Sequence, residues 1–186
     1  MAWDDPKAAP DPLAAVQDFI NTAHRMRGAD ELRTADRAST VLAELGLVGD
    51  GEYVDDTDRR RLVGFREALR AVLLARTGGE CDVAADATAL DRAVEAVPLR
   101  MRFSPAGRPA VGVAPDGPVA ERAVATVLAA IAAADGEGDW ERLKACANDA
   151  CRWAFYDASR NRSGRWCDMN VCGARHKMRT YRERHR

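Results

Sequence analysis

Residues 146–186, CANDACRWAFYDASRNRSGRWCDMNVCGARHKMRTYRERHR, decide how the C-terminal part of this chain folds. The segment contains Cys146, Cys151, Cys167 and Cys172, spaced as C-x4-C-x15-C-x4-C. A tetrahedral structural zinc site needs two close cysteine pairs separated by a short insert, because each pair turns back on one metal ion. The spacing therefore predicts a four-cysteine zinc finger.

The same cysteines would also permit two disulfides, a redox role or simple burial. Nothing else in the chain suggests export, and paired cysteines in a reducing compartment more often bind metal. Unrelated core cysteines would not fall into two equally spaced pairs when the preceding 145 residues contain only Cys81. Four thiolates leave no open coordination position, so we expect Zn²⁺ to hold the fold together and to do no chemistry.

Between and after the cysteines, the residues predict a knuckle, a hairpin and a helix. The aromatic run 152–157 suits a strand, 158–164 has turn residues, and 165–167 resumes an extended segment. These segments predict a hairpin between the two cysteine pairs. Gly173 is expected to let the chain bend closely around the metal, and the residues from 174 onward predict a helix.

This final helix would carry two neighbouring stripes of side chains. One stripe contains Ala174, Met178, Tyr181 and His185. The other contains Arg175, Arg179, Arg182 and Arg186. We expect the first stripe to pack on Trp153, Phe155 or Trp166, and the arginines to face solvent.

The segment from Cys146 to Arg186 closely resembles the CGNR zinc finger, a family named for the tetrad at its last metal ligand. The cysteine pairs, the SRNRSGRWC centre and the basic tail carry the resemblance over about a quarter of the chain. The tetrad here is Cys172-Gly173-Ala174-Arg175, so alanine replaces the family's asparagine. In that family an ABATE domain precedes the finger, and the resemblance implies a stress-induced bacterial transcription regulator.

The charge of the chain is distributed unevenly. The 186 residues have a net charge of -1, yet residues 141–186 contain 12 Lys and Arg against 5 Asp and Glu. The preceding 140 residues contain 16 against 24 and are therefore acidic. An acidic body with a basic tail indicates a nucleic-acid contact confined to the tail, although a merely solvated charged helix would give the same pattern.

No segment has the character of a signal peptide or of a membrane span. The N-terminus, MAWDDPKAAPDP, lacks an apolar core, and no later stretch offers about eighteen uncharged apolar residues. We therefore expect a cytoplasmic protein with no membrane partner, whose cysteines stay reduced. Cys81 is expected to be an unreactive core or loop residue.

The remaining sequence predicts a mainly α fold. It has a helical ABATE-like domain over 1–138 with one β-hairpin, followed by the zinc finger over 139–186. Apolar periodicity and capping residues predict helices over about 12–26, 34–46, 56–76, 82–97 and 118–136. Asp82 is the expected cap of the fourth helix. The hairpin is expected between Leu99 and Val113, and DGEGD at 135–139 is expected to be a linker.

Two groups of polar residues in this domain have more than one interpretation. The opening helix resembles the start of the ABATE domain, where a similar Phe-x-Asn-Thr element recurs, so Asn21 and Thr22 are candidate ligand contacts. Both side chains could equally satisfy backbone groups near a helix end. Arg66 and Arg70 are expected on the solvated side of the third helix, although arginines beside an apolar face can also line an anion pocket.

Conventional catalytic motifs are missing from the sequence. We find no phosphate-binding loop or dinucleotide fingerprint, and the three histidines lie away from any nucleophile, so we expect no enzyme activity. The leading hypothesis is a dimeric regulator that binds double-stranded DNA, with an N-terminal domain that senses a small molecule or dimerises. The candidate DNA contacts are Arg160, Arg162, Arg165, Arg175, Lys177, Arg179, Arg182 and Arg184. The alternatives are an RNA- or ribosome-associated zinc protein, and a ligand-binding protein whose finger mediates protein interactions.

Overall fold

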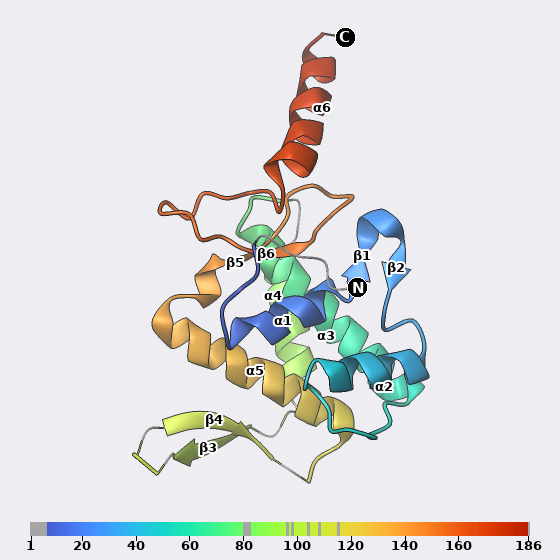
Figure 1. The fold of residues 1–186 in the computed structure, drawn as a ribbon, viewed down its shortest axis with the longest axis vertical. Helices are drawn as coiled ribbons and strands as arrows, with labels where there is room; N and C mark the ends of the chain where they lie inside the picture. The colour runs from blue at the N-terminus through green and yellow to red at the C-terminus, as the bar shows by residue number, and fades with distance from the viewer. Residues whose placement is uncertain are drawn as a thin grey trace.

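The computed structural model describes residues 7–79, 83–95, 97, 99–103, 105–107, 109–114 and 116–185. In chain order the described elements are α1 (Leu13–Asn21), β1 (Ala23–His24), η1 (Arg25–Arg27), β2 (Ala29–Asp30), α2 (Ala35–Glu44), α3 (Asp56–Ala75), α4 (Val83–Val94), β3 (Leu99–Phe103), β4 (Pro109–Val113), α5 (Val119–Glu137), η2 (Trp140–Arg142), β5 (Leu143–Ala145), β6 (Ala154–Tyr156), η3 (Met169–Gly173) and α6 (Ala174–Arg184) (Figure 1). The strands of these described elements pair only in twos, and helices dominate, which confirms the mainly α class. None of the helices in the described part is long and apolar enough to cross a bilayer.

The main hydrophobic core lies among α1, α2, α3 and α5. Phe19 and Phe65 are fully buried at its centre, with ring centroids 6.1 Å apart. Side chains cap the first turns of two of these helices. The hydroxyl of Thr34 accepts a hydrogen bond from the first turn of α2, and the carboxylate of Asp55 accepts two from the first turn of α3.

Two helix boundaries differ from the sequence-based expectation. The first helix stops at Asn21, because residues 23–30 form a small hairpin of β1 and β2 around the turn η1. The fifth helix continues to Glu137 and ends with Gly138 in the left-handed conformation at φ 76°, so most of the expected linker belongs to α5. Cys81 and Asp82 lie outside the described residues.

The hairpin predicted between Leu99 and Val113 is confirmed. Strands β3 and β4 pair antiparallel, with Leu99 opposite Val113 and Phe103 opposite Pro109. Figure 1 shows this hairpin at the end of the molecule opposite to α6. The helical body therefore separates β3–β4 from the cysteine-rich segment.

A second hairpin, of β5 and β6, joins the helical body to the cysteine-rich segment (Figure 1). Side chains alternate along β6: Ala154 and Tyr156 face the main core, while Phe155 faces a smaller cluster around the cysteines. Leu143 and Ala145 of β5 are also fully buried in the main core. The β5–β6 hairpin thus contributes side chains to both the main core and the cluster around the cysteines.

The position of the β5–β6 hairpin corrects the hairpin predicted between the two cysteine pairs. Strand β6 pairs with residues that precede the first cysteine, so the β5–β6 hairpin encloses the first pair instead. The aromatic run does form a strand, but its backbone partner is Leu143–Ala145. No strand is formed at 158–167, whose conformation is fixed by side-chain hydrogen bonds instead.

Arg66 and Arg70 of α3 are buried, so the expectation that they face solvent is wrong. Each is only 2% exposed. The guanidinium of Arg66 forms a bidentate ion pair with Asp30 of β2, with both contacts at 2.8 Å. Arg70 donates to the backbone carbonyl oxygens of Ile20, Ala23 and Arg152, and Glu67 accepts from both arginines. These groups supply the hydrogen-bond acceptors that a buried guanidinium requires.

The contacts of Arg70 predict a large effect on stability. We expect Arg70→Met to lower the free energy of unfolding by about 3–5 kcal/mol, because it leaves Glu67 and several buried carbonyl groups without their donor. Urea unfolding monitored by circular dichroism measures the loss. Arg60→Met, on the exposed side of the same helix, is the matched control and should change stability by less than about 0.5 kcal/mol. Equal stability of the two variants would contradict the assigned role of Arg70.

Candidate metal centre and nucleic-acid interface

The four predicted cysteine ligands come together in the structure. The sulfur atoms of Cys146, Cys151, Cys167 and Cys172 all lie within 4.8 Å of one another. The sulfur of Cys167 lies 3.6 Å from that of Cys151 and 3.8 Å from that of Cys172. Four sulfurs at a tetrahedral metal–sulfur distance of about 2.3 Å would be about 3.8 Å apart, so the side chains fit a four-thiolate metal site.

Hydrogen bonds prepare this cluster for negative charge. The side-chain amide of Asn148 donates to the sulfur of Cys172 at 3.4 Å. Backbone amides of Asn148 and Cys167 also contribute to lowering the pKa of the Cys146 thiol. Donors of this kind orient thiolate ligands and offset part of their charge.

The pKa shifts of three of the thiols favour a bound cation. Hydrogen bonds from Cys151 and Cys167 lower the pKa of Cys146 to about 2. Donating to that thiolate raises the pKa of Cys151 to about 12, and hydrogen bonds to Cys146 and Cys151 also raise the pKa of Cys167. The raised pKa values of Cys151 and Cys167 oppose full deprotonation of the cluster in the absence of a cation. A metal cation provides the positive charge that lets all four deprotonate.

The chain after the third cysteine is shaped by a capped π-helical turn, η3. The carboxylate of Asp168 accepts hydrogen bonds from the backbone amides of Asn170 and Val171. Gly173 has ordinary helical dihedral angles, so it is not needed for a sharp bend at the metal. Its role is close approach, because a Cβ at Gly173 would lie 2.4 Å from the sulfur of Met169.

The loop 158–165 is held by the buried carboxylate of Asp157. This carboxylate accepts from Lys144 Nζ at 2.7 Å, from the amide of Gly164 at 2.7 Å and from the amide of Ser159 at 3.1 Å. Burial would raise the pKa of Asp157, but these hydrogen bonds outweigh it and hold the pKa well below its usual range. The closest carboxylate oxygen would be 2.8 Å from a Cβ at Gly164, which explains the glycine there.

The loop brings three of the predicted nucleic-acid contacts to the surface at the α6 end of the molecule (Figure 1). Arg160 is exposed at its tip. Arg162 is exposed as well and forms an ion pair with Glu141. Arg165 donates from Nε to the carbonyl of Thr77 at 2.8 Å and lies over the ring of Trp166. Two of the three arginines therefore also serve to attach the loop to the body.

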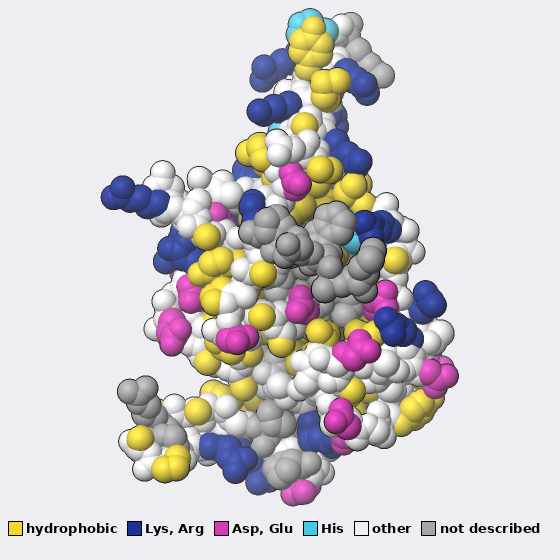
Figure 2. Space-filling model, in the orientation of Figure 1, with side chains coloured by type: hydrophobic (Ala, Val, Ile, Leu, Met, Phe, Trp, Pro, Cys, Tyr) yellow, Lys and Arg dark blue, Asp and Glu magenta, His cyan; other side chains and the backbone are white. Residues whose placement is uncertain are grey.

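Helix α6 stands away from the body, and the structure buries none of its described residues (Figures 1 and 2). The predicted packing of its apolar stripe is wrong, because Met178 is 55% and Tyr181 is 60% exposed. Phe155 and Trp166 are already covered by the cysteines, by Ala147 and by Met26. From α6, the ring of His176 contacts that of Trp166, with centroids 4.9 Å apart.

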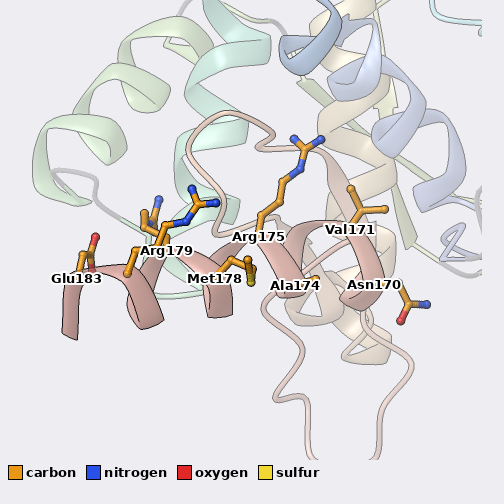
Figure 3. A pocket seen from close by; sticks show the side chains of 8 residues that line it. Asn170, Val171, Ala174, Arg175, Met178, Arg179 and Glu183 are labelled. Carbon is orange, nitrogen blue, oxygen red and sulfur yellow. The ribbon is translucent and has the colours of Figure 1, made fainter. Parts of the chain in front are cut away.

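The remaining predicted nucleic-acid contacts, Arg175, Lys177, Arg179, Arg182 and Arg184, are all exposed on α6. Figure 3 shows that Arg175 and Arg179 extend from the same side of the helix, next to Met178. Together with Asn170, Val171 and Ala174 they line an open groove of about 790 Å³. Ala174, which replaces the family's asparagine, therefore lies on this exposed surface and not among the metal ligands.

Asn21 and Thr22, the candidate ligand contacts, are used inside the molecule. The amide side chain of Asn21 donates to the carbonyl of Ala154 at 2.9 Å and accepts from its amide at 2.8 Å. Thr22 donates to the carbonyl of Phe19 and accepts from Arg66. Asn21 thus attaches β6 to α1. The sequence did not predict this attachment, because Asn21 and Ala154 are 133 residues apart in the chain.

The structure combines a helical body, a cluster of four cysteines that can hold a metal ion, and an exposed basic helix. This combination is typical of a zinc-finger protein. The family model for the CGNR zinc finger matches residues 142–185, and the ABATE model, described as "Putative stress-induced transcription regulator", matches residues 13–150. Because the second match covers more than half of the chain, the protein belongs to the ABATE family, as the sequence resemblance predicted. No curated protein matches the chain.

The geometry of the cysteines predicts one metal ion per chain. Removing it with a chelator should abolish hydrogen-exchange protection around the four cysteines, because the small cluster has little core without the ion. The amide of Ala154 should stay protected, since it is bonded to Asn21 and faces the main core. Metal analysis combined with hydrogen exchange tests both points. Cys151→Ser, which should bind no metal at neutral pH, is the control; protection that persists in the chelated protein and in this variant would contradict the site.

The depressed pKa of Asp157 predicts a pH-dependent stability. A carboxylate with a lowered pKa in the folded protein stabilises it above the unfolded pKa of about 4, and this contribution is lost as the pH falls toward the folded value. Asp157→Asn should therefore cost about 3 kcal/mol at pH 7, and the difference from wild type should shrink as the pH falls below about 4. Urea unfolding across this range measures it. Asp91→Asn, at an exposed position of α4, should show no such trend.

Proposed function

We propose that this protein is a bacterial transcription regulator that binds duplex DNA through its C-terminal zinc finger. The observation that carries the proposal is α6, a projecting helix whose base is fixed by the cysteine cluster and whose cationic side chains are exposed. Zinc is the proposed ion, because it favours four thiolates in tetrahedral geometry and the matching family is a zinc finger. With its ligand set closed, the ion has a structural role, and we propose no enzyme activity.

The dimensions and chemistry of α6 suit the major groove. An α-helix with its side chains is about 10–12 Å in diameter, which fits a major groove about 12 Å wide. Arg175 and Arg179 share one side of the helix, and their planar guanidinium groups suit both phosphate oxygens and guanine edges. Lys177, Arg182 and Arg184 are positioned to reach flanking phosphates.

The loop 158–165 supplies a second contact. Arg160 is exposed at its tip, whereas Arg162 and Arg165 also bond to Glu141 and Thr77. We therefore assign the main phosphate contact of the loop to Arg160. The Asp157–Lys144 pair holds the loop in one conformation, which lowers the entropy cost of the contact.

The acidic helical body completes the proposal. One finger offers a small footprint, so useful affinity requires a homodimer that presents two fingers, and the body is the proposed site of dimerisation. A small molecule sensed at Asn21 and Thr22 would have to replace their bonds to Ala154 and Arg66, which couples ligand binding to the attachment of the finger. The cytoplasm is the proposed location, because the four thiolates must stay reduced.

RNA is the second candidate partner. The observation that favours it is the exposed aromatic ring of Tyr181, since single-stranded bases stack on such rings. Competition among duplex DNA, single-stranded DNA and structured RNA, measured at two salt concentrations, separates the candidates. Preference for a particular duplex sequence supports the regulator. Absence of nucleic-acid binding would leave the finger as a protein-interaction module.

The double variant Arg175→Ala/Arg179→Ala tests the role of α6. We expect its affinity for duplex DNA to fall at least about tenfold, because two charge-assisted contacts are lost. The slope of log Kobs against log salt should decrease by about 1.8. Electrophoretic or fluorescence titrations measure both. The control, Arg100→Ala/Arg102→Ala, removes the same charge from the distant β3 strand and should leave binding unchanged. If the α6 variant binds DNA as tightly as wild type, α6 is not the helix that contacts DNA.

A further inference from the structure

The β1–β2 hairpin of the helical body contacts the base of the finger. Met26, in the turn η1, packs against the cysteine cluster. Its sulfur lies 3.8 Å from Nη1 of Arg175 in the first turn of α6. The ring of His24 lies 5.0 Å from that of Trp153. Figure 1 shows the turn of the hairpin directed toward the α6 end of the molecule, so the hairpin and α6 share one surface.

The hairpin is fixed in this position by the body. Asp30 forms the bidentate ion pair with buried Arg66, and the amide of Glu31 donates to the carbonyl of Thr22 at 2.8 Å. Gly28 closes the turn in the left-handed conformation at φ 61°, with its amide bonded to the carbonyl of Arg25. A surface held in this way binds a partner with little loss of conformational entropy.

The exposed side chains of the turn are basic. Arg25 and Arg27 flank Met26, and both are exposed. Among the residues that the structure describes, the carboxylates of Asp30 and Glu67 pair with the two buried arginines of α3, and that of Glu31 pairs with Arg37. Arg25 and Arg27 place two further positive charges on the turn that contacts Arg175 through Met26.

We infer that the DNA surface extends from the finger onto the ABATE domain, where Arg25 and Arg27 contact the phosphate backbone next to the base of α6. This inference rests on the proposed DNA-binding function and names a second, non-finger part of the same site. Guanidinium groups on a rigid turn suit phosphate oxygens, which position a protein on the duplex without reading its sequence. The turn thereby sets the orientation in which α6 meets the groove.

The test compares three variants of the full-length, metal-loaded chain on one mixed-sequence duplex at about 50 and about 200 mM salt. Arg25→Ala/Arg27→Ala should lower the affinity at least about tenfold and reduce the salt slope by about 1.8, because two phosphate contacts are lost. Arg25→Lys/Arg27→Lys should keep the salt slope, since the charges remain. Arg100→Ala/Arg102→Ala, with the same change of net charge on β3, should bind like wild type. Metal content and thermal unfolding show whether each variant is folded.

The outcomes are distinguishable. A loss confined to the Arg25→Ala/Arg27→Ala variant supports the extended surface. Equal losses in this variant and in the β3 control would show a general effect of net charge and overturn the inference, as would wild-type affinity in all three. If wild type itself fails to bind duplex DNA, the proposed function and the inference both fall; if wild type binds and only the α6 arginines matter, the inference alone falls.

Discussion

The guanidinium of Arg70 is the constraint on which the arrangement of this protein depends. Buried in α3, it donates to the carbonyl of Ile20 at the end of α1, to that of Ala23 at the start of the β1–β2 hairpin and to that of Arg152 beside the second cysteine. One side chain therefore connects the body, the hairpin and the metal-binding segment. A buried guanidinium is costly unless its N–H groups all find acceptors. The three segments are therefore held in the positions from which their carbonyl oxygens accept hydrogen bonds from Arg70.

Metal binding and hydrophobic packing are linked through β6. Its alternating side chains place Ala154 in the main core and Phe155 against the cysteines, while Asn21 bonds to both backbone groups of Ala154. Thr77 and Arg76 of the body add hydrogen bonds to the backbone of β5. The metal therefore does not stabilise a separate module. The metal site packs against one face of the β5–β6 hairpin, and the other face of this hairpin packs against the helical body.

Apolar periodicity, turn residues and cysteine spacing were sufficient to predict most helices, the β3–β4 hairpin and the clustering of the four cysteines, because these signals can be read from short stretches of sequence. The partner of β6 and the burial of Arg66 and Arg70 could not be predicted in this way. Arginine at the edge of an apolar stripe is expected to be solvated, and only distant acceptors such as Asp30 and the carbonyl of Arg152 reverse that expectation. The exposure of Met178 was missed because the rings it was expected to cover are already covered by the chain around the cysteines. Charge counting likewise could not show that the turn at Arg25 folds beside α6.

The hydrogen bonds that attach β6 to α1 limit how the finger can be exchanged between proteins in evolution. If recombination transferred the finger to an unrelated protein, the backbone groups of Ala154 and the carbonyl of Arg152 would lose the side chains that satisfy them, at a cost comparable to the stability of a small domain. We therefore expect the finger and the body to be inherited together. The overlap of the two family matches at residues 142–150, which contain β5 and the first cysteine, falls on the segment that both parts must share.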